Sequence, residues 1–399
     1  MQTNDPGHLF QTTKQLNDAA DHARKVPATE KIGDPIHVSG KVLALEIRGQ
    51  QAWTAESGWQ ARRLDLRTGK TKRLYKGHKG PVTSLALLDI ASTASVPAWQ
   101  ALFTGSWDKT IKIWNSESGE LVTTLEGHSD FVKSLTIIPG SSPFLLSTSS
   151  DRTFRLWALR PLLAGDRPFH LQTIKDHTRP IECVAWSEEL DANSTPTGEI
   201  SVWTGDSMGI IKQWLLKSGR LEHAGDLKAH ETSVAEMTVV DEGIWSVSMD
   251  NTAVFHSPPS SPSSHNHTIP HSRYVKSVLS LPDVVPGKSL LLTGSEDEDI
   301  RVWDVSAVQD DRTKLLATVQ GHCGEVSCIR RWLKEDGESG TKSWMVVSGS
   351  LDGTLRRWTI QDLLHPTPID YEPTPEEDTS GGMTAEEERE LAELMSDDE

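Results

Sequence analysis

One phrase recurs along this chain at fixed internal offsets. A His is followed four residues later by a Val, and farther along an Asp precedes a Trp by six residues. The four full copies are Gly77-His78 with Asp108 and Trp114, Gly127-His128 with Asp151 and Trp157, Pro270-His271 with Asp297 and Trp303, and Gly321-His322 with Asp352 and Trp358. Several offsets that agree four times over are the signature of a repeat architecture, in which each copy forms one structural unit.

Three weaker copies fill the intervals between the full ones. Their departures are Met208 at the Asp position of the fourth copy, His256 at the Trp position of the fifth, and Gly58 and Leu64 at the Asp and Trp positions of the first. The Trp positions then fall at 64, 114, 157, 214, 256, 303 and 358, and the most closely spaced of them repeat at roughly 40–45 residues. The sequence therefore contains seven units.

The phrase resembles the WD40-repeat family over residues of about 31–361. The dipeptide that names the family is present as Trp303-Asp304 and, altered, as Trp114-Asn115. The resemblance implies an all-β, seven-bladed β-propeller of the WD40 type, with four antiparallel strands in each blade around a central channel. We expect an N-terminal extension with a short helix over 1–30, the propeller over 31–365, and a disordered acidic tail with a short helix over 366–399.

In this family the repeated Asp accepts a hydrogen bond from the His, and a Ser or Thr of the second strand links that His to the Trp indole. The network satisfies buried polar groups, each of which would otherwise cost ~1–3 kcal/mol. We therefore predict structural rather than catalytic or metal-binding roles for His78, Asp108, Trp114, His128, Asp151, Trp157, His271, Asp297, Trp303, His322, Asp352 and Trp358. The first, fourth and fifth copies are expected to break the network, which would leave the first blade loose.

Two terminal segments carry expectations of their own. Residues Lys31 to Ile36 are in position to pair as the outer strand of the last blade, which would close the ring and remove exposed edges. Leu9 to Lys25 suits a short amphipathic helix, either packed on the propeller or bound to a partner. Thr384-Ala-Glu-Glu387 is a capping box that predicts a tail helix through Met395. That tail either aids solubility or folds on a partner.

The charge is concentrated in the tail. The chain has a formal net charge of −17, and Pro366 to Glu399 contain thirteen acidic residues and one Arg, a net of −12, which leaves −5 for the rest. A nearly neutral body argues against direct nucleic-acid binding. The N-terminus has no signal-peptide pattern, and no apolar run approaches the roughly 18 residues of a membrane span. Three cysteines without a C-x-x-C pair favour a reducing compartment. We expect an intracellular protein, in the cytoplasm, the nucleus or both, without membrane partners.

Binding is better supported than catalysis. The sequence has no glycine-rich phosphate loop, nucleophile elbow or zinc-ligand spacing, so we expect no enzyme activity, cofactor or metal; an enzyme with a site in the channel is the alternative from another class. Two loop positions on the top face recur as contact positions in the family, and here they hold Trp107, Phe131, Met249, Tyr274 and Leu351. Large apolar side chains in exposed loops suit interface anchors.

Three cations are expected to surround these anchors, namely Arg152, Arg179 and Arg273, and they favour a partner with acidic or phosphorylated residues. Phe131 and Tyr274 have a second interpretation, which is local packing across neighbouring blades. The sequence predicts a non-enzymatic interaction scaffold or adaptor, a monomer within a hetero-complex.

A more specific hypothesis concerns Leu145 to Arg160. This segment resembles the sixteen-residue box by which some WD40 proteins dock on the adaptor of cullin-four ubiquitin ligases. Asp151, Trp157 and Arg160 match the box, whereas Ala158 stands where it has Asp. The resemblance implies that Arg160 reaches an adaptor from the bottom face, and that the protein is a substrate receptor of a cullin-RING ligase.

Overall fold

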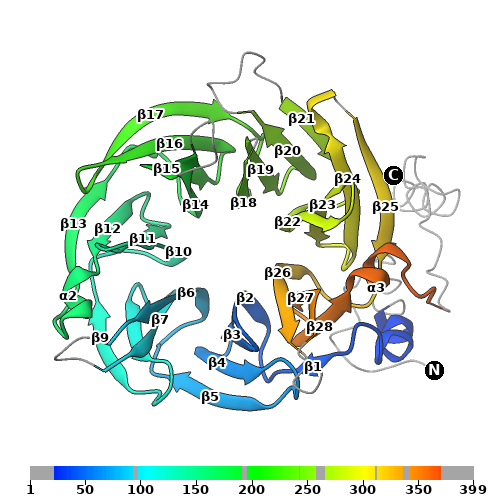
Figure 1. Cartoon of the computed structure of the whole chain (residues 1–399), viewed down its shortest axis with the longest axis horizontal. Helices are drawn as coiled ribbons and strands as arrows, with labels where there is room; N and C mark the ends of the chain where they lie inside the picture. Colours follow the sequence, from blue (N-terminus) through cyan, green and yellow to red (C-terminus); the bar gives the residue numbers. More distant parts are fainter. Residues whose placement is uncertain are drawn as a thin grey trace, which may run out of the picture. The chain divides into compact units, whose positions relative to one another are not determined.

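The computed structural model describes residues 22–92, 97–190, 196–241, 243–257, 266–310, 312–335 and 341–369. Residues 29–369 form one compact unit, in which seven four-stranded antiparallel sheets stand in a ring (Figure 1). The predicted seven-bladed propeller is confirmed. Residues 22–29 are helical; the rest of the predicted Leu9–Lys25 helix, and the acidic tail from residue 370 with its predicted helix, lie outside the described residues.

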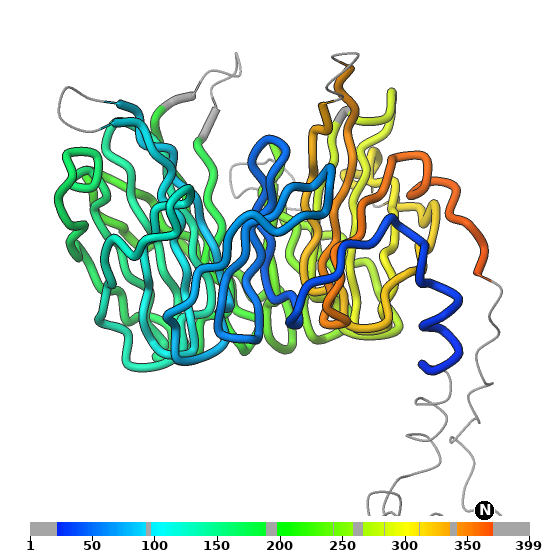
Figure 2. Tube along the Cα trace, turned by 90° about the horizontal axis from the view of Figure 1, so that it is seen from below, coloured from blue at the N-terminus to red at the C-terminus, as the bar shows by residue number. Residues whose placement is uncertain are grey.

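The strands follow one another around the ring in chain order, and Figure 2 shows the ring from its side. The described strands are β1 (Ile36–His37), β2 (Val42–Arg48), β3 (Gln51–Glu56), β4 (Gln60–Asp65), β5 (Thr71–Lys76), β6 (Val82–Ile90), β7 (Trp99–Ser106), β8 (Ile111–Asn115), β9 (Leu121–Leu125), β10 (Val132–Ile138), β11 (Phe144–Ser149), β12 (Phe154–Ala158), β13 (Phe169–Ile174), β14 (Ile181–Leu190), β15 (Pro196–Asp206), β16 (Ile210–Lys217), β17 (Arg220–Lys228), β18 (Val234–Val240), β19 (Gly243–Ser248), β20 (Thr252–His256), β21 (Asn266–Pro270), β22 (Val275–Val285), β23 (Lys288–Ser295), β24 (Ile300–Ala307), β25 (Arg312–Val319), β26 (Val326–Glu335), β27 (Lys342–Ser350) and β28 (Thr354–Thr359). The short helices are α2 (Arg160–Leu163), η2 (Val308–Asp310) and α3 (Ile360–Leu364).

Each blade consists of four strands, a to d, from the channel outward. Blades one to six are β2–β5, β6–β9, β10–β13, β14–β17, β18–β21 and β22–β25, and blade seven is β26–β28 with β1 on its outer edge. The loops that join strand d to strand a, and the turns that join strand b to strand c, meet on one face, which we call the top face.

A buried β-branched residue begins every strand a, and a β-bulge follows it at once. The pairing with strand b shifts by one residue immediately after Val42, Val82, Val132, Ile181, Val234, Val275 and Val326. A bulge leaves one residue outside the regular ladder and redirects its side chain. The bulged residues are Leu43, Thr83, Lys133, Glu182, Ala235, Lys276 and Ser327, and all seven line the central channel.

The core is divided between the blades. In the described part of the chain, the buried apolar residues fall into seven clusters, and each cluster spans one pair of neighbouring blades. Trp114, for example, packs with Trp53 and Tyr75 of blade one. Because every blade is buried against two neighbours, none can leave the ring without exposing two of these interfaces to water.

Ring closure joins the start of the propeller to its end. β1 pairs with β28, with Ile36 opposite Leu355 and His37 opposite Thr354. An N-terminal strand therefore closes the ring on the predicted edge of blade seven, but the predicted segment was wrong: the strand is Ile36–His37, and of Lys31–Ile36 it includes only Ile36. Gly33 and Asp34 have φ of 68° and 44°, and this left-handed turn prevents the chain from extending earlier.

Candidate functional site

In blades two, three and seven an imidazole bridges an Asp and a hydroxyl group. His78 Nδ1 lies 2.8 Å from Asp108 Oδ2, its Nε2 lies 2.7 Å from Thr104 Oγ1, and the Trp114 indole donates to the same hydroxyl over 2.9 Å. The matching groups are His128, Asp151, Ser147 and Trp157 in blade three, and His322, Asp352, Ser348 and Trp358 in blade seven. Both nitrogens of each imidazole are used, so these rings have no free position for a substrate or metal.

The carboxylates of these networks are held in their ionised form. Burial alone would raise the pKa of Asp108, but hydrogen bonds from His78 and Thr110 outweigh it, and the pKa is well below its ordinary value. The pKa values of Asp151 and Asp352 are lowered in the same way by His128 and His322.

Blade four has a complete network, contrary to the sequence-based expectation. His177 Nδ1 lies 3.1 Å from Asp206 Oδ2, and Thr204 links His177 to the Trp214 indole over 2.7 and 2.9 Å. Asp206 stands two residues before the predicted position, at the end of β15. The backbone N–H of Met208 also donates to Asp206, so the carboxylate serves both the His and the turn.

Blade five is complete as well, with a substituted donor. His230 lies 3.1 Å from Asp250 and 2.8 Å from the Ser246 hydroxyl, and Ser246 lies 2.9 Å from His256 Nε2. His256 thus takes the place of the indole. Burial lowers the pKa of His256 to about 4, which keeps it neutral near pH 7.

Blade six was predicted to have the complete network, but its His and Asp do not pair with each other. Trp303 and His271 both contact Thr293, over 3.0 and 2.9 Å, but His271 Nδ1 faces the backbone oxygen of Ile269. Asp297 is instead paired with Arg301 over 2.7 Å. The Asp297 carboxylate is already occupied, because Arg301 donates to both of its oxygens and the Ser272 hydroxyl donates to it over 2.8 Å.

Blade one is held by a buried ion pair, so the expectation of a loose blade is wrong. Arg62 Nε donates to Glu56 Oε1 over 2.6 Å, and Thr54 donates to the same oxygen over 3.0 Å. The Glu56 side chain is fully buried. Glu56 is at the end of strand b, as Asp206 is in blade four, and a guanidinium replaces the imidazole.

The top face contains an exposed aromatic pair. Trp107 in the b–c turn of blade two stacks on Phe131 at the start of blade three, with ring centroids 4.9 Å apart and planes 15° apart. The side chains are nevertheless 42% and 36% exposed. Phe131 therefore packs locally across neighbouring blades, which was the alternative interpretation of its sequence position. The two rings together still expose a flat apolar surface to solvent.

Tyr274 and Leu351 have surroundings that differ from those of the aromatic pair. The Tyr274 hydroxyl donates to Glu325 of blade seven over 2.6 Å, and burial together with this carboxylate raises the pKa of Tyr274. Leu351 is half-buried and lines the channel, as does Trp107. Met249 of blade five is 44% exposed, with no contact to the aromatic pair.

The three predicted arginines are exposed on the top face in three different blades. Arg152 is the left-handed residue of the b–c turn of blade three, with φ of 66°. Arg179 and Arg273 are in the d–a loops of blades four and six. Arg152 and Arg179 flank the side of the face that holds Phe131, whereas Arg273 adjoins Tyr274.

Two exposed apolar side chains of the top face were not predicted as contact residues. Trp59 is 55% exposed and has φ of 64°, at the turn position held elsewhere by Lys109, Arg152, Gly209, Asn251, Glu298 and Gly353. Met208 is 48% exposed in the corresponding turn of blade four. The signal for Trp59 was available, because it follows the Gly58 assigned to the Asp position of its repeat.

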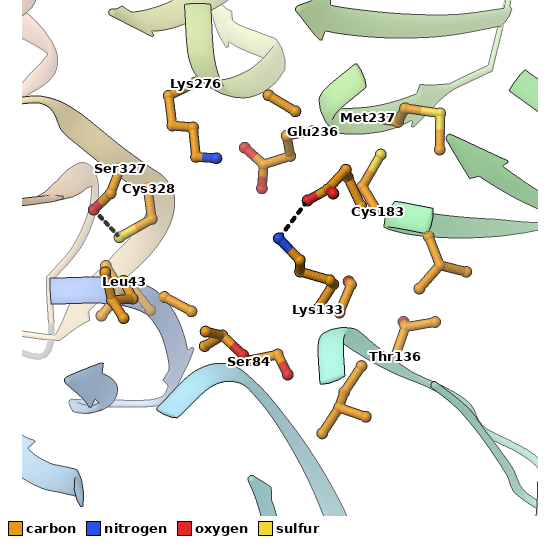
Figure 3. Close-up of a pocket in the computed structure, with 18 of the residues that line it drawn as sticks. Leu43, Ser84, Lys133, Thr136, Cys183, Glu236, Met237, Lys276, Ser327 and Cys328 are labelled. Atoms are coloured by element: carbon orange, nitrogen blue, oxygen red, sulfur yellow. Dashed lines mark hydrogen bonds and ion pairs between the residues drawn. The ribbon is translucent and has the colours of Figure 1, made fainter. Parts of the chain in front are cut away.

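The central channel is a cavity of about 640 Å³. Its charged side chains include two ion pairs: Lys133 with Glu182 over 3.0 Å, and Arg330 with Glu236 over 2.9 Å. Figure 3 shows Lys133, Glu236 and Lys276 directed into the cavity from three different blades. Burial raises the pKa of Glu46, which also lines the channel, despite the nearby Arg330.

On the bottom face, Arg160 is exposed at the first residue of α2. It lines a groove of about 800 Å³ between blades three and four, and Phe169 and Leu171 also line this groove. Those two side chains are 52% and 40% exposed. The bottom connection from β20 to β21 in blade five was also predicted, and its residues 258–265 lie outside the described part.

Two negative findings apply to the described ranges. No three His, Cys, Asp or Glu side chains there are grouped so as to hold a metal ion. None of the helices in these ranges has the length and apolar character needed to span a membrane.

Comparison with known proteins agrees with this architecture. The sequence model of the WD domain, G-beta repeat, matches residues 69–115, 119–158, 263–304 and 313–359, in blades two, three, six and seven. The chain is 30% identical to an uncharacterized WD repeat-containing protein of Schizosaccharomyces pombe, over 100% of both chains.

Two more distant relatives have more informative names. Serine-threonine kinase receptor-associated protein of Homo sapiens is 26% identical over 73% of this chain and 70% of its own length. Nuclear distribution protein PAC1 of Coccidioides posadasii is 33% identical over 32% of this chain and 29% of its own. With its seven blades, its repeated His–Asp networks and a full-length WD-repeat relative, the chain belongs to the WD40-repeat family.

Proposed function

We propose that this protein is a non-enzymatic scaffold or adaptor that holds a partner protein on its top face, centred on Trp107 and Phe131. The proposal rests on one observation: the two rings stack on each other and are nevertheless exposed to solvent. Interface anchors are typically large aromatic side chains whose burial on binding supplies most of the affinity. A stack also holds both rings in place before binding, which reduces the entropy lost when the partner docks.

Charge around the stack favours an acidic partner. Lys79, Lys109, Arg152 and Arg179 are exposed in the loops of blades two, three and four, and they form no ion pair with any residue that the structure describes. Cations without a counter-ion beside an apolar surface suit a segment that carries Asp, Glu or phosphorylated residues. Met249, Leu351, Tyr274 and Arg273 would extend the contact across blades five to seven.

The relatives support the same class of function. One is named for association with a kinase receptor, and another for nuclear distribution; neither name describes a catalytic activity. WD40 propellers generally bind other proteins, and the family is typically non-catalytic. We further propose an intracellular protein that acts as one copy within a hetero-complex, with the propeller over 31–365 as its binding domain.

The test is affinity purification of tagged protein followed by mass spectrometry, with the Trp107→Ala/Phe131→Ala double variant. We expect this variant to lose its partners while its thermal midpoint stays within a few degrees of wild type. Trp344→Ala is the matched control, because Trp344 is a similarly exposed Trp, at 41%, in the part of β27 distant from the top face. An unchanged set of partners in the double variant would refute the proposal.

The groove beside Arg160 favours a second candidate, the substrate receptor of a cullin-RING ubiquitin ligase. An exposed guanidinium next to exposed Phe169 and Leu171 is a surface on which an adaptor protein can dock. Co-purification of the ligase adaptor with wild type, and its loss with Arg160→Ala, is the expected result. An adaptor absent from the wild-type sample, or bound equally by both, excludes this candidate.

A further inference from the structure

The seven bulged residues of the strands a form one ring around the upper part of the channel. Blade by blade they are Leu43, Thr83, Lys133, Glu182, Ala235, Lys276 and Ser327, and each lines the cavity. Because the same bulge recurs in every blade, the fold itself directs these seven side chains to one level. The ring holds two Lys and one Glu, so its net charge is +1.

All four other polar members of the ring have partners within the protein. The hydroxyls of Thr83 and Ser327 donate to the backbone oxygens of Val132 and Val42, over 2.6 and 2.7 Å. Lys133 pairs with Glu182 over 3.0 Å. Lys276 is different: within the described residues its ammonium forms neither an ion pair nor a hydrogen bond, and in Figure 3 it points into the cavity.

The carboxylates near Lys276 are engaged elsewhere. Glu236 accepts from Arg330 over 2.9 Å and from the backbone N–H of Val278 over 2.9 Å. Glu325 accepts from Tyr274 over 2.6 Å. Arg330 reaches Glu236 past the whole of blade six, from blade seven to blade five, so this pair crosses the channel. Among the described cations of the cavity lining, Lys276 alone forms no ion pair, whereas the carboxylates of the lining are Glu46, Glu182, Glu236 and Glu325.

A cation in a concave, partly dehydrated cavity attracts an anion more strongly than one on an open surface, because the protein walls focus its field. A volume of about 640 Å³ is within the range of roughly 300–1,000 Å³ typical of ligand sites. We propose that the upper channel is an anion subsite, in which Lys276, assisted by Lys133, binds a carboxylate or phosphate group.

The anion has two possible sources with the same chemistry. It is either an acidic or phosphorylated side chain of a partner docked on the top face, which rests on the proposed function, or a small free anion. Trp107 and Leu351 line the same cavity, so a segment bound at the aromatic pair has a direct path to Lys276.

The experiment uses ³¹P NMR and isothermal titration of the purified full chain. The probes are inorganic phosphate, pyrophosphate, and two alanine-rich pentapeptides with a central phosphoserine or glutamate. We expect Lys276→Met to weaken binding of the bound probe at least tenfold, and Lys276→Arg to retain it. Lys288→Met is the matched control: Lys288 is exposed at the far end of blade six, where β23 begins, and forms no ion pair with a described residue.

Tighter binding of a peptide than of either inorganic anion identifies the source as a partner side chain, and the reverse identifies a free anion. No binding of any probe to wild type, or equal binding to wild type and Lys276→Met, overturns the proposal. The Phe131→Ala variant separates the two proposals, because Phe131 belongs to the aromatic pair but is not among the described residues that line the cavity. It is expected to bind the inorganic anions normally, so a failed partner capture and a failed anion site are distinguishable.

Discussion

His177 Nδ1 lies 3.1 Å from Asp206 Oδ2, although Asp206 precedes its Trp by eight residues, whereas the paired Asp of blades two, three and seven precedes its Trp by six. In blade two that earlier position is Ser106, whose hydroxyl donates to the backbone oxygen of Gly80. The longer Asp side chain reaches from the same place to the imidazole. Asp206 accepts from His177 and from the backbone N–H groups of Met208 and Ile210. It thus takes the acceptor roles that Ser106 and Asp108 divide in blade two, but as a carboxylate it cannot donate to a carbonyl as Ser106 does.

Replacement of Asp206 by Ala is expected to destabilise the propeller by about 2–3 kcal/mol, because His177 and two turn N–H groups lose their acceptor in a buried site. Chemical denaturation measures the effect. Met208→Ala, two residues away and 48% exposed, is the control, expected within about 0.5 kcal/mol of wild type. Equal stability of Asp206→Ala and wild type would contradict the network role.

Deletion of residues 1–37 is expected to lower stability by about 3 kcal/mol or more, because it removes β1 and opens the ring. The deletion also removes backbone acceptors that serve blade seven: Arg357 N–H donates to Gly33 over 2.6 Å and Arg356 donates to Thr29 over 2.9 Å. Each such bond contributes on the order of 1 kcal/mol. Deletion of 376–399 is the comparison, with an expected midpoint close to wild type, and equal midpoints for both deletions would exclude this closure.

Mild acid is expected to weaken the fold through His256. Burial lowers the pKa of His256 to about 4, whereas the unfolded chain has a His pKa of about 6.5. The unfolded state therefore binds the proton first as pH falls, and stability that is complete above pH 6.5 is lost between pH 6.5 and about 4. From pH 7 to pH 5 the loss for this group is about 2 kcal/mol.

The check is a series of denaturation curves between pH 7 and pH 5 for wild type and His256→Gln. The Gln side chain keeps a donor for Ser246 but cannot titrate. The free energy of unfolding of the variant should therefore change less steeply with pH, by the equivalent of nearly one proton. The pKa of His271 is also lowered to about 4, first by burial, so some pH dependence will remain in the variant. Identical slopes for the two proteins would show that His256 does not titrate as stated.

Trp59→Asn is expected to stabilise the protein by about 1 kcal/mol. A bulky side chain in the left-handed region is strained, and Asn251 already holds the matching turn of blade five with φ of 65°. Thermal unfolding measures the change, with Asn251→Trp as the reverse substitution and a destabilising effect expected. Lower stability of Trp59→Asn would mean that Trp59 makes favourable contacts that outweigh the strain.

The sequence predicted the ring because the offsets agree in four repeats and can be recognised in the other three. It was wrong about blades four and five, whose networks are complete, and about blade six, where Asp297 pairs with Arg301 and not with His271. In blade one the His network is absent as expected, but an Arg–Glu pair replaces it. A hydrogen bond depends on which side chain reaches its partner, and the repeat position alone does not decide this. Asp206 and Glu56 serve as acceptors in their blades from the end of strand b, and His256 contacts the Ser246 hydroxyl where an indole was expected. A template with Asp six residues before Trp excludes all three.

The candidate site was predictable only in part. Trp107 and Phe131 follow from loop positions within the repeat, but their stacking needs the distance between two blades. The ring around Lys276 depends on a bulge, and a one-residue shift reverses which face a side chain occupies. The sequence of strand a in blade six does not indicate a bulge, since Val275 to Leu279 is a short, mostly apolar run with a single Lys.

The pairing of Ile36 with Leu355 also determines how late in synthesis the ring can close. During synthesis residue 36 is made long before residue 355. The β1 segment therefore stays unpaired while the first six blades form. Contacts so distant in sequence slow folding more than they reduce final stability, because loop-closure entropy grows only with the logarithm of length. Until β28 arrives, the unfinished ring exposes two bare edges, and this interval is when the chain is most open to aggregation or to capture by chaperones.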